Sequence, residues 1–203
     1  MSRQRTSVAA LGAFLLFAWL ASEVALGHAL GFDAPVRAFV HQFASPGLTA
    51  VMRIATALGP GAFFWVSAAC VVVVLLYLRR TRDAARLLIT LACAGLLDMS
   101  LKAGFHRPRP APFFDTPLPN SYSFPSGHAL FSLCLYGTLA VLLRARARRP
   151  ATRVAIWLLA IALIALIGLS RIYLGVHYPS DVIAGYAVAL VWMLAAGIVD
   201  RML

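Results

Sequence analysis

Residues 151–169 read ATRVAIWLLAIALIALIGL, with Arg153 as the single charged residue in the run. A helix of about 20 residues crosses roughly 30 Å of hydrocarbon, so this run suits a membrane-spanning helix. Five further apolar blocks lie at residues 8–30, 61–78, 84–101, 127–143 and 181–199. The blocks lack the alternation of strands, and in lipid only helices or closed barrels satisfy their own backbone hydrogen bonds. The sequence therefore predicts an all-α, polytopic membrane protein with a six-transmembrane-helix bundle.

The composition agrees with this prediction. Of the 203 residues, 62% are hydrophobic and 12% are charged, whereas soluble domains keep about a quarter of their residues charged. We expect residues 1–203 to form one domain. The cysteines Cys70, Cys93 and Cys134 lie within apolar blocks without a Cys-x-x-Cys pair, so we interpret them as packing residues.

The first apolar block has a second interpretation. Arg3 and Arg5 precede an apolar run followed by small residues, a pattern shared with secretory signal peptides. Because the run exceeds the usual signal-peptide length, we expect a retained span. A mature N-terminus near Ala25 would indicate cleavage instead.

The positive charges predict the orientation of the spans. With the N-terminus inside, twelve of the eighteen lysines and arginines fall in cytoplasmic segments, which places both termini in the cytoplasm. The other six lie in outer segments: Arg37, Arg53, Lys102, Arg107, Arg109 and Arg171. The arginines border apolar blocks instead of forming one stripe, so the net charge of +11 does not indicate a nucleic-acid partner.

The outer segment at residues 33–43 is expected to form a short helix in the membrane interface. Asp33 suits a cap at the helix start, and Pro35 suits the first turn. Apolar side chains recur on one face at positions 36, 39, 40 and 43. Gly59-Pro60-Gly61 then breaks the chain before the second span.

Two outer segments carry groups that suit a phosphate. Lys102, Arg109 and Arg171 supply fixed positive charges, and guanidinium groups bind tetrahedral oxyanions in a bidentate manner. Ser126 and Gly127 open the fourth span, where free N–H groups and the helix dipole attract anions and a glycine allows close approach. Counting spans puts these groups on one side of the membrane, so we expect a phosphate site there.

Two histidines complete the expected site. His177 lies four residues before Asp181, a spacing at which a hydrogen bond can form. A carboxylate partner fixes the imidazole tautomer and makes the other ring nitrogen a better nucleophile. His128 is then free to protonate the leaving oxygen and later to activate water. The cations would stabilise charge during in-line phosphoryl transfer.

These residues form three motifs that resemble the signature of the type-2 phosphatidic acid phosphatase family. The motifs are Lys102-x6-Arg109-Pro110, Pro125-Ser126-Gly127-His128 and Ser170-Arg171-x5-His177-x3-Asp181, and their eleven fixed positions match in order. The six-span plan resembles the membrane branch of the family across nearly the whole chain.

The resemblance implies a role for each matching residue. His177 would form a phosphohistidine, Asp181 would orient it, and His128 would act as general acid. Phosphoryl oxygens would be bound by Lys102, Arg109, Ser126, Gly127 and Arg171, with Ser170, Pro110 and Pro125 in supporting positions. No metal or cofactor is expected, because the fixed cations repel a divalent ion, although His106, His128, His177, Asp98 and Asp181 are nominal ligands.

The expected function is hydrolysis of a lipid phosphate, with membrane lipids as the other partners. The resemblance implies undecaprenyl pyrophosphate, phosphatidic acid, phosphatidylglycerol phosphate or diacylglycerol pyrophosphate as substrate. Arg107, as an extra cation, would favour the prenyl pyrophosphate. Phosphotransfer to an alcohol stays open, and a non-catalytic lipid transporter is less expected. We expect a bacterial inner membrane location, with the site at the periplasmic ends of spans three to six.

Asp98 lies one turn before Lys102, inside the third span. An ionisable group at that depth is costly unless it is paired. We therefore expect Asp98 to pair with Lys102 or with another nearby cation.

Overall fold

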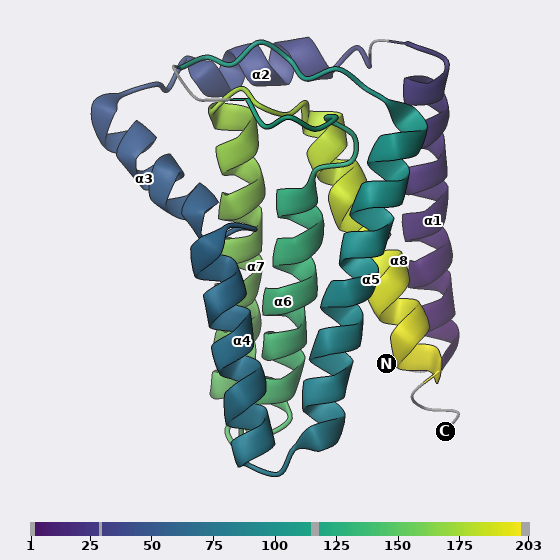
Figure 1. Cartoon of the computed structure of the whole chain (residues 1–203), viewed down its shortest axis with the longest axis vertical. Helices are drawn as coiled ribbons and strands as arrows, with labels where there is room; N and C mark the ends of the chain where they lie inside the picture. Colours follow the sequence, from purple (N-terminus) through teal and green to yellow (C-terminus); the bar gives the residue numbers. More distant parts are fainter. Residues whose placement is uncertain (1–2, 29, 115–117, 200–203) are drawn as a thin grey trace.

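Figure 1 shows the computed structural model, which describes residues 3–28, 30–114 and 118–199. Every regular element within these ranges is a helix. In chain order the helices are α1 (Arg3–Ala25), α2 (Asp33–His41), α3 (Pro46–Ala57), α4 (Ala62–Tyr77), α5 (Thr81–Phe105), α6 (Gly127–Arg144), α7 (Pro150–Tyr173) and α8 (Pro179–Val199). The prediction of an all-α fold is confirmed.

The described helices contain five that are long and apolar enough to cross a membrane, namely α1, α5, α6, α7 and α8. The described residues contain one further candidate, the pair α3 and α4, which meet at a bend of 44° and have the length and composition of a broken span or a re-entrant loop. The second span was expected at residues 61–78, where the structure has α4 (Ala62–Tyr77) preceded by the bend to α3. α4 alone has only 16 residues, and Gly59 and Pro60 lie at the bend instead of before the span.

The helix at α3 was not predicted, although its start follows ordinary capping rules. Pro46 occupies the first turn, and Oγ of Ser45 accepts a hydrogen bond from the backbone N–H of Leu48 at 3.3 Å. Its 12 residues are too few for a membrane span, which is why the search for long apolar blocks passed over them.

The two ends of the bundle differ (Figure 1). The turns between α4 and α5 and between α6 and α7 lie at one end, where α1 also begins. At the other end α2 lies across the bundle, close to the end of α7, the start of α8 and the segment joining α5 to α6. α6 occupies a central position and packs against α5, α7 and α8, while α1 packs along α8.

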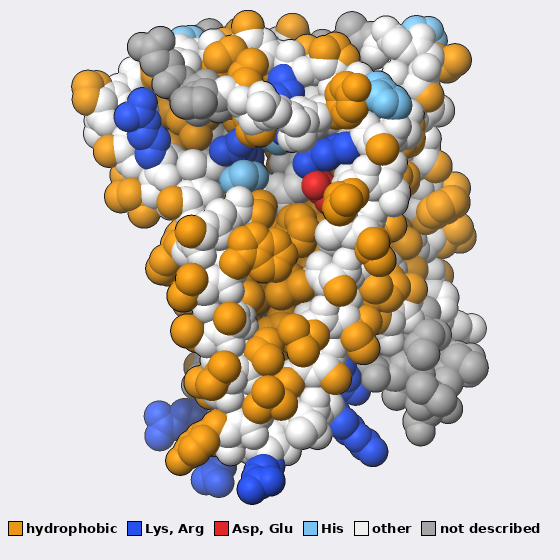
Figure 2. Space-filling view, viewed as in Figure 1, with side chains coloured by type: hydrophobic (Ala, Val, Ile, Leu, Met, Phe, Trp, Pro, Cys, Tyr) orange, Lys and Arg blue, Asp and Glu red, His pale blue; other side chains and the backbone are white. Residues whose placement is uncertain are grey.

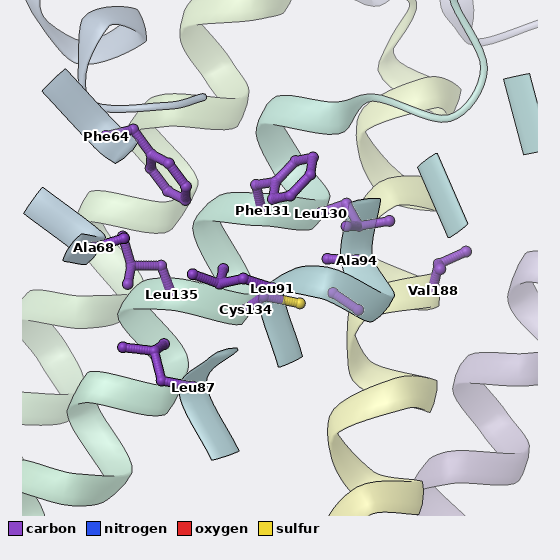
Figure 3. Close-up of a cluster of buried hydrophobic side chains, with 11 residues drawn as sticks. Phe64, Ala68, Leu87, Leu91, Ala94, Leu130, Phe131, Cys134, Leu135 and Val188 are labelled. Atoms are coloured by element: carbon purple, nitrogen blue, oxygen red, sulfur yellow. The ribbon is translucent and has the colours of Figure 1, made fainter. Parts of the chain in front are cut away.

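The main hydrophobic core joins α4, α5, α6 and α8, as Figure 3 shows. Phe64 of α4, Leu87 of α5 and Leu130 of α6 are fully buried in it. Lipid tails are as apolar as these side chains, so close van der Waals packing between helices stabilises such a core more than the hydrophobic effect does.

A close crossing of α6 and α8 places the starts of these helices together. A Cβ added at Gly185 would lie 2.5 Å from the backbone oxygen of Ser126 and 2.9 Å from Cβ of Ala129, so only glycine permits this approach. At the same crossing the N–H of Ser126 donates to the backbone oxygen of Asp181 at 2.9 Å. Two motifs that lie far apart in the sequence are thereby fixed side by side.

Candidate active site

Charged side chains gather in a hollow near the end of the bundle that α2 crosses. In Figure 2, Lys, Arg, His and acidic side chains lie in this hollow, and mainly hydrophobic side chains cover the face below it. Further Lys and Arg side chains project from the opposite end. The hollow is therefore a polar site bordered by a surface that suits lipid.

His177 and Asp181 form a buried pair at the start of α8. Nδ1 of His177 lies 3.3 Å from Oδ2 of Asp181, and the two side chains are 2% and 0% exposed. Oδ2 also accepts from the backbone N–H of Tyr178 at 2.9 Å and from the hydroxyl of Ser123. The carboxylate is thus held in one orientation against the imidazole, as the four-residue spacing predicted.

The other ring nitrogen of His177 faces Arg109. Nη1 of Arg109 lies 3.0 Å from Nε2 of His177 and donates to the backbone oxygen of Val176 at 3.0 Å. A guanidinium has no acceptor, so Nε2 is the acceptor and the ring proton sits on Nδ1, facing Asp181. The network therefore assigns the tautomer whose Nε2 is unprotonated and accepts from Arg109.

Arg109 is anchored by the segment that precedes α6. Its Nε donates to the backbone oxygen of Ser121 at 2.7 Å, and Nη2 donates to Oγ of Ser121 at 3.0 Å. These contacts fix the guanidinium plane beside His177.

Burial controls the protonation of His177. Removal from water, followed by the charges of Arg109, Arg171 and Lys102, holds the pKa of His177 well below its usual 6.5. A neutral imidazole is the form that can act as a nucleophile.

Lys102 and Asp98 form the pair that the sequence predicted. Nζ of Lys102 lies 2.8 Å from Oδ2 of Asp98, with side chains 15% and 17% exposed. A Cβ added at Gly127 would lie 2.8 Å from Oδ1 of Asp98 and 3.3 Å from Nζ of Lys102. Lys102 thus lies directly against the start of α6, and Oδ1 of Asp98 has no hydrogen-bond partner.

Arg171 and His128 are held by the bend between α3 and α4. Nη1 of Arg171 donates to Oγ1 of Thr56 at 2.5 Å, while its buried Nε has no partner. The backbone at Gly59 packs so closely on the ring of His128 that a Cβ there would collide with Cδ2. The hydroxyl of Tyr136 on α6 donates to the backbone oxygen of Leu58 at 2.7 Å and fastens the bend to the bundle.

The remaining motif residues are buried around these groups. Ser126 precedes α6 but makes no side-chain capping bond, and its buried Oγ has no partner. Oγ of Ser170 donates to the backbone oxygen of Ile167, three residues earlier in α7, at 2.6 Å. Pro110 and Pro125 are buried in the segment between α5 and α6.

Arg107 differs from its expected role as a cation free to meet substrate. Its Nη1 donates to Oδ1 of Asp181 at 2.6 Å and to Oγ of Ser180 at 2.8 Å, and its Nη2 donates to Oδ2 of Asp33 at 2.9 Å. The sequence-based preference for a pyrophosphate depended on this charge, so that argument no longer holds.

Asp33 also differs from its expected role. Phe32 is the N-cap of α2 and makes no side-chain capping bond, and Oδ1 of Asp33 instead accepts from the backbone N–H of Ser180 at 2.9 Å. Asp33 therefore caps α8, which follows it by almost 150 positions. The sequence contains no local signal for such a contact.

The described residues include no group of three or more His, Cys, Asp or Glu side chains placed to hold a metal ion. The cations Lys102, Arg109 and Arg171 approach the imidazole of His177 closely enough to lower its pKa. Such an arrangement attracts an anion and repels a divalent cation. Chemically, the site can bind a tetrahedral oxyanion beside a neutral, carboxylate-paired histidine.

Membrane-length helices with a cluster of fixed cations and a carboxylate-paired histidine at one end define a membrane protein with a candidate oxyanion site. The model of the PAP2 superfamily matches residues 83–201, more than half of the chain, and the chain belongs to this family. The expected family is therefore confirmed.

Individual relatives extend the similarity beyond the matched segment. The chain is 29% identical over 180 residues to phosphatidylglycerophosphatase B of Bacillus subtilis, covering 87% of each chain. It is 35% identical over 130 residues to the undecaprenyl-diphosphatase of Sulfolobus acidocaldarius, covering 61% of this chain and 57% of the relative.

The fold matches a solved membrane protein. The crystal structure of a transmembrane PAP2-type phosphatidylglycerolphosphate phosphatase from Bacillus subtilis superposes with a TM-score of 0.83 and 27% identity. The match covers 96% of this chain and 97% of that chain. Together with its apolar helices, this likeness identifies the chain as an integral membrane protein of the PAP2 fold.

Proposed function

We propose that the protein hydrolyses the phosphate headgroup of a membrane lipid through a phosphohistidine at Nε2 of His177. The observation that carries this proposal is the environment of that nitrogen. Its lone pair faces Arg109 at 3.0 Å, while Nδ1 is paired with the buried carboxylate of Asp181. Nε2 therefore lies beside a cation that can bind an anion, and Asp181 fixes the tautomer through Nδ1. This arrangement suits attack of Nε2 on phosphorus.

In the proposed reaction, Nε2 of His177 bonds to phosphorus as the bond to the lipid oxygen breaks. His128 donates a proton to the leaving oxygen and then accepts a proton from water. That water attacks phosphorus, the phosphorus–nitrogen bond breaks, and inorganic phosphate leaves. Asp181 stabilises the positive charge on the imidazole throughout.

Lys102, Arg109 and Arg171, with the N–H groups of Ser126 and Gly127, would bind the phosphoryl oxygens. The free Oγ of Ser126 and the free Nε of Arg171 support this assignment, because buried polar groups in folded proteins normally have partners. Fixed cations can stabilise the charge of the transition state without a metal ion, so we propose a metal-independent hydrolase.

The substrate that we propose is a lipid with a phosphomonoester headgroup, such as phosphatidylglycerol phosphate. The relative that covers 87% of both chains is a phosphatidylglycerophosphatase, and Arg107 is engaged by protein carboxylates. The apolar face below the charged hollow suits acyl chains (Figure 2). The site would face the periplasm of a bacterial inner membrane, with both termini in the cytoplasm, because arginines crowd the opposite end.

The proposal is tested by phosphate release from a lipid panel with EDTA present. The panel contains phosphatidylglycerol phosphate, phosphatidic acid, undecaprenyl pyrophosphate and diacylglycerol pyrophosphate. We expect release that survives EDTA, is highest on a phosphomonoester and is lost in His177→Ala. Activity that disappears with EDTA, or that persists in His177→Ala, contradicts the proposal.

A further inference from the structure

A chain of charged groups runs from α2 to the proposed nucleophile. Nη2 of Arg107 lies 2.9 Å from Oδ2 of Asp33, and Nη1 of Arg107 lies 2.6 Å from Oδ1 of Asp181. Asp181 in turn contacts His177 through its other oxygen at 3.3 Å. The order Asp33–Arg107–Asp181–His177 thus connects two carboxylates and an imidazole through one guanidinium.

The whole chain of groups is shielded from water. The side chains of Arg107, Asp33 and Asp181 are 11%, 6% and 0% exposed. The guanidinium carbon of Arg107 also lies 4.1 Å from the centroid of the Tyr178 ring, which covers one face of the group. Charges in such surroundings interact strongly, and each requires a partner.

Arg107 fixes the oxygen of Asp181 that does not meet the imidazole. Asp181 contacts Arg107 through Oδ1 and His177 through Oδ2, so rotation of the carboxylate would break both contacts. Both N–H groups of Nη1 have acceptors, namely Oδ1 of Asp181 and Oγ of Ser180. Three of the five N–H groups of Arg107 are therefore engaged by side chains of the protein.

Asp33 holds Arg107 from the other side and ties it to α8. Its carboxylate accepts from the backbone N–H of Ser180 at 2.9 Å and from Oγ of Ser180 at 2.6 Å. A negative charge at the first turn of α8 is also stabilised by the helix dipole. Asp33 lies outside residues 83–201, the part of the chain that the family model matches.

We propose that Arg107 and Asp33 are positioning residues that hold Asp181, and through it His177, in the orientation for attack. This inference rests on the proposed function, because it assigns both residues to the same phosphoryl-transfer step. Neither residue contacts the substrate. α2 is therefore a structural part of the site and not only a helix in the membrane interface.

The test compares Arg107→Met, Arg107→Lys and Asp33→Asn with the wild type in detergent-purified, monodisperse protein. The readouts are kcat and KM for the preferred lipid phosphate and Ki for inorganic phosphate. We expect Arg107→Met to lower kcat about 10- to 100-fold, the usual effect of removing an orienting partner, with KM and Ki changed less than about twofold. Arg107→Lys should recover part of kcat, because it keeps a charge but cannot contact both carboxylates at once.

The double variant Asp33→Asn/Arg107→Met separates charge positioning from simple loss of packing. Removing Arg107 alone leaves the buried carboxylates of Asp33 and Asp181 without their shared cation. The double variant also removes the negative charge of Asp33, so only one carboxylate remains unpaired by a cation. We expect the double variant to have a higher kcat than Arg107→Met. A kcat equal to or below that of Arg107→Met contradicts the inference.

Two matched controls change the same residue types elsewhere. Arg53 is exposed on α3, and Asp83 pairs with Arg80 at 2.6 Å at the start of α5. Arg53→Met and Asp83→Asn should leave kcat and KM unchanged. If Arg107→Met does not fold, Arg107→Lys and Asp33→Asn test the inference instead. We expect both variants to have a lower kcat than the wild type.

The inference and the proposed function fail in different ways. If the wild type releases no phosphate, or His177→Ala remains active, the proposed function is wrong. If those two behave as expected but the Arg107 variants keep the kcat of the wild type, the positioning role is wrong. A raised KM and Ki with unchanged kcat would assign Arg107 to substrate binding and likewise overturn the inference.

Discussion

The imidazole of His177 lies between a carboxylate that accepts from Nδ1 and a guanidinium that donates to Nε2. Asp181 favours the charged imidazolium, whereas burial and the cations oppose it. The net result is a pKa well below 6.5, with burial as the largest cause. A neutral ring with a fixed tautomer is thus maintained before substrate binds.

This balance predicts the response of His177 to pH. As the pH falls through about 6.5, an ordinary histidine takes up a proton, but His177 should stay neutral because its pKa in the folded protein is lower. Nitrogen NMR of histidine-labelled protein without substrate measures this state, with the signal assigned by its loss in His177→Gln. A His177 signal that titrates at or above about 6.5 would contradict the assignment.

Asp98 predicts a second effect at this scale. Its Oδ1 lies close to Gly127, where the phosphate would bind, and Lys102 already contacts the same position. Asp98→Asn removes a negative charge that repels the phosphate, so Ki for inorganic phosphate should fall about fivefold, or about 1 kcal/mol. The measurement is product inhibition, and a raised Ki would indicate that Asp98 is needed to place Lys102.

The contacts of individual residues also show which parts of the site can be predicted from the sequence. The Asp98–Lys102 and His177–Asp181 pairs were predicted because each joins residues one helical turn apart. The roles of Asp33 and Arg107 in the site were not predicted, because their partners lie more than 70 positions away along the chain. Such contacts depend on how helices pack, which residue spacing does not encode.

At the scale of elements, the bend between α3 and α4 determines the surroundings of His128 and Arg171. Thr56 contacts Arg171, Gly59 packs on His128, and Leu58 accepts from Tyr136. The sequence indicated a chain break at Gly59-Pro60-Gly61 but not that the break lies in the site. A search for long apolar blocks identifies the length of a span, but it does not show where a span bends.

The bend predicts unequal effects for two neighbouring glycines. A Cβ at Gly59 collides with the His128 ring, whereas a Cβ at Gly61 meets only the backbone oxygen of Gly59 at 3.8 Å. Gly59→Ala should therefore lower turnover of a lipid phosphate at least about tenfold by moving the general acid. Gly61→Ala is the matched control and should retain full turnover.

A substrate with a good leaving group separates this effect from unfolding. The leaving oxygen of p-nitrophenyl phosphate needs little protonation. The initial burst of product from this substrate should therefore be reduced much less in Gly59→Ala than the turnover of a lipid phosphate. Equal losses on both substrates would show that the substitution damages the fold instead of displacing His128.

At the scale of the whole molecule, the bundle separates a site end from an arginine-rich end (Figure 2). Six apolar blocks and the positive-inside rule predicted this arrangement, because both depend on composition along the chain. The close crossing of α6 and α8 at Gly185 could not be predicted, since it depends on which helices become neighbours.

The orientation is tested by labelling single cysteines in a background without the three native ones. Leu118 is 42% exposed near the site end, and Ala145 is exposed after α6 at the opposite end. An impermeant maleimide should label Leu118→Cys in intact spheroplasts and Ala145→Cys only after permeabilisation. The reverse pattern would place the site in the cytoplasm.

The most direct test of the central claim is to trap the phosphoenzyme. Protein is mixed with radiolabelled lipid phosphate in EDTA, quenched in alkali and mapped by mass spectrometry. We predict an alkali-stable, acid-labile phosphate on His177 that is absent in His177→Ala. Turnover without a labelled protein, or a label on another residue, would contradict the proposed phosphohistidine.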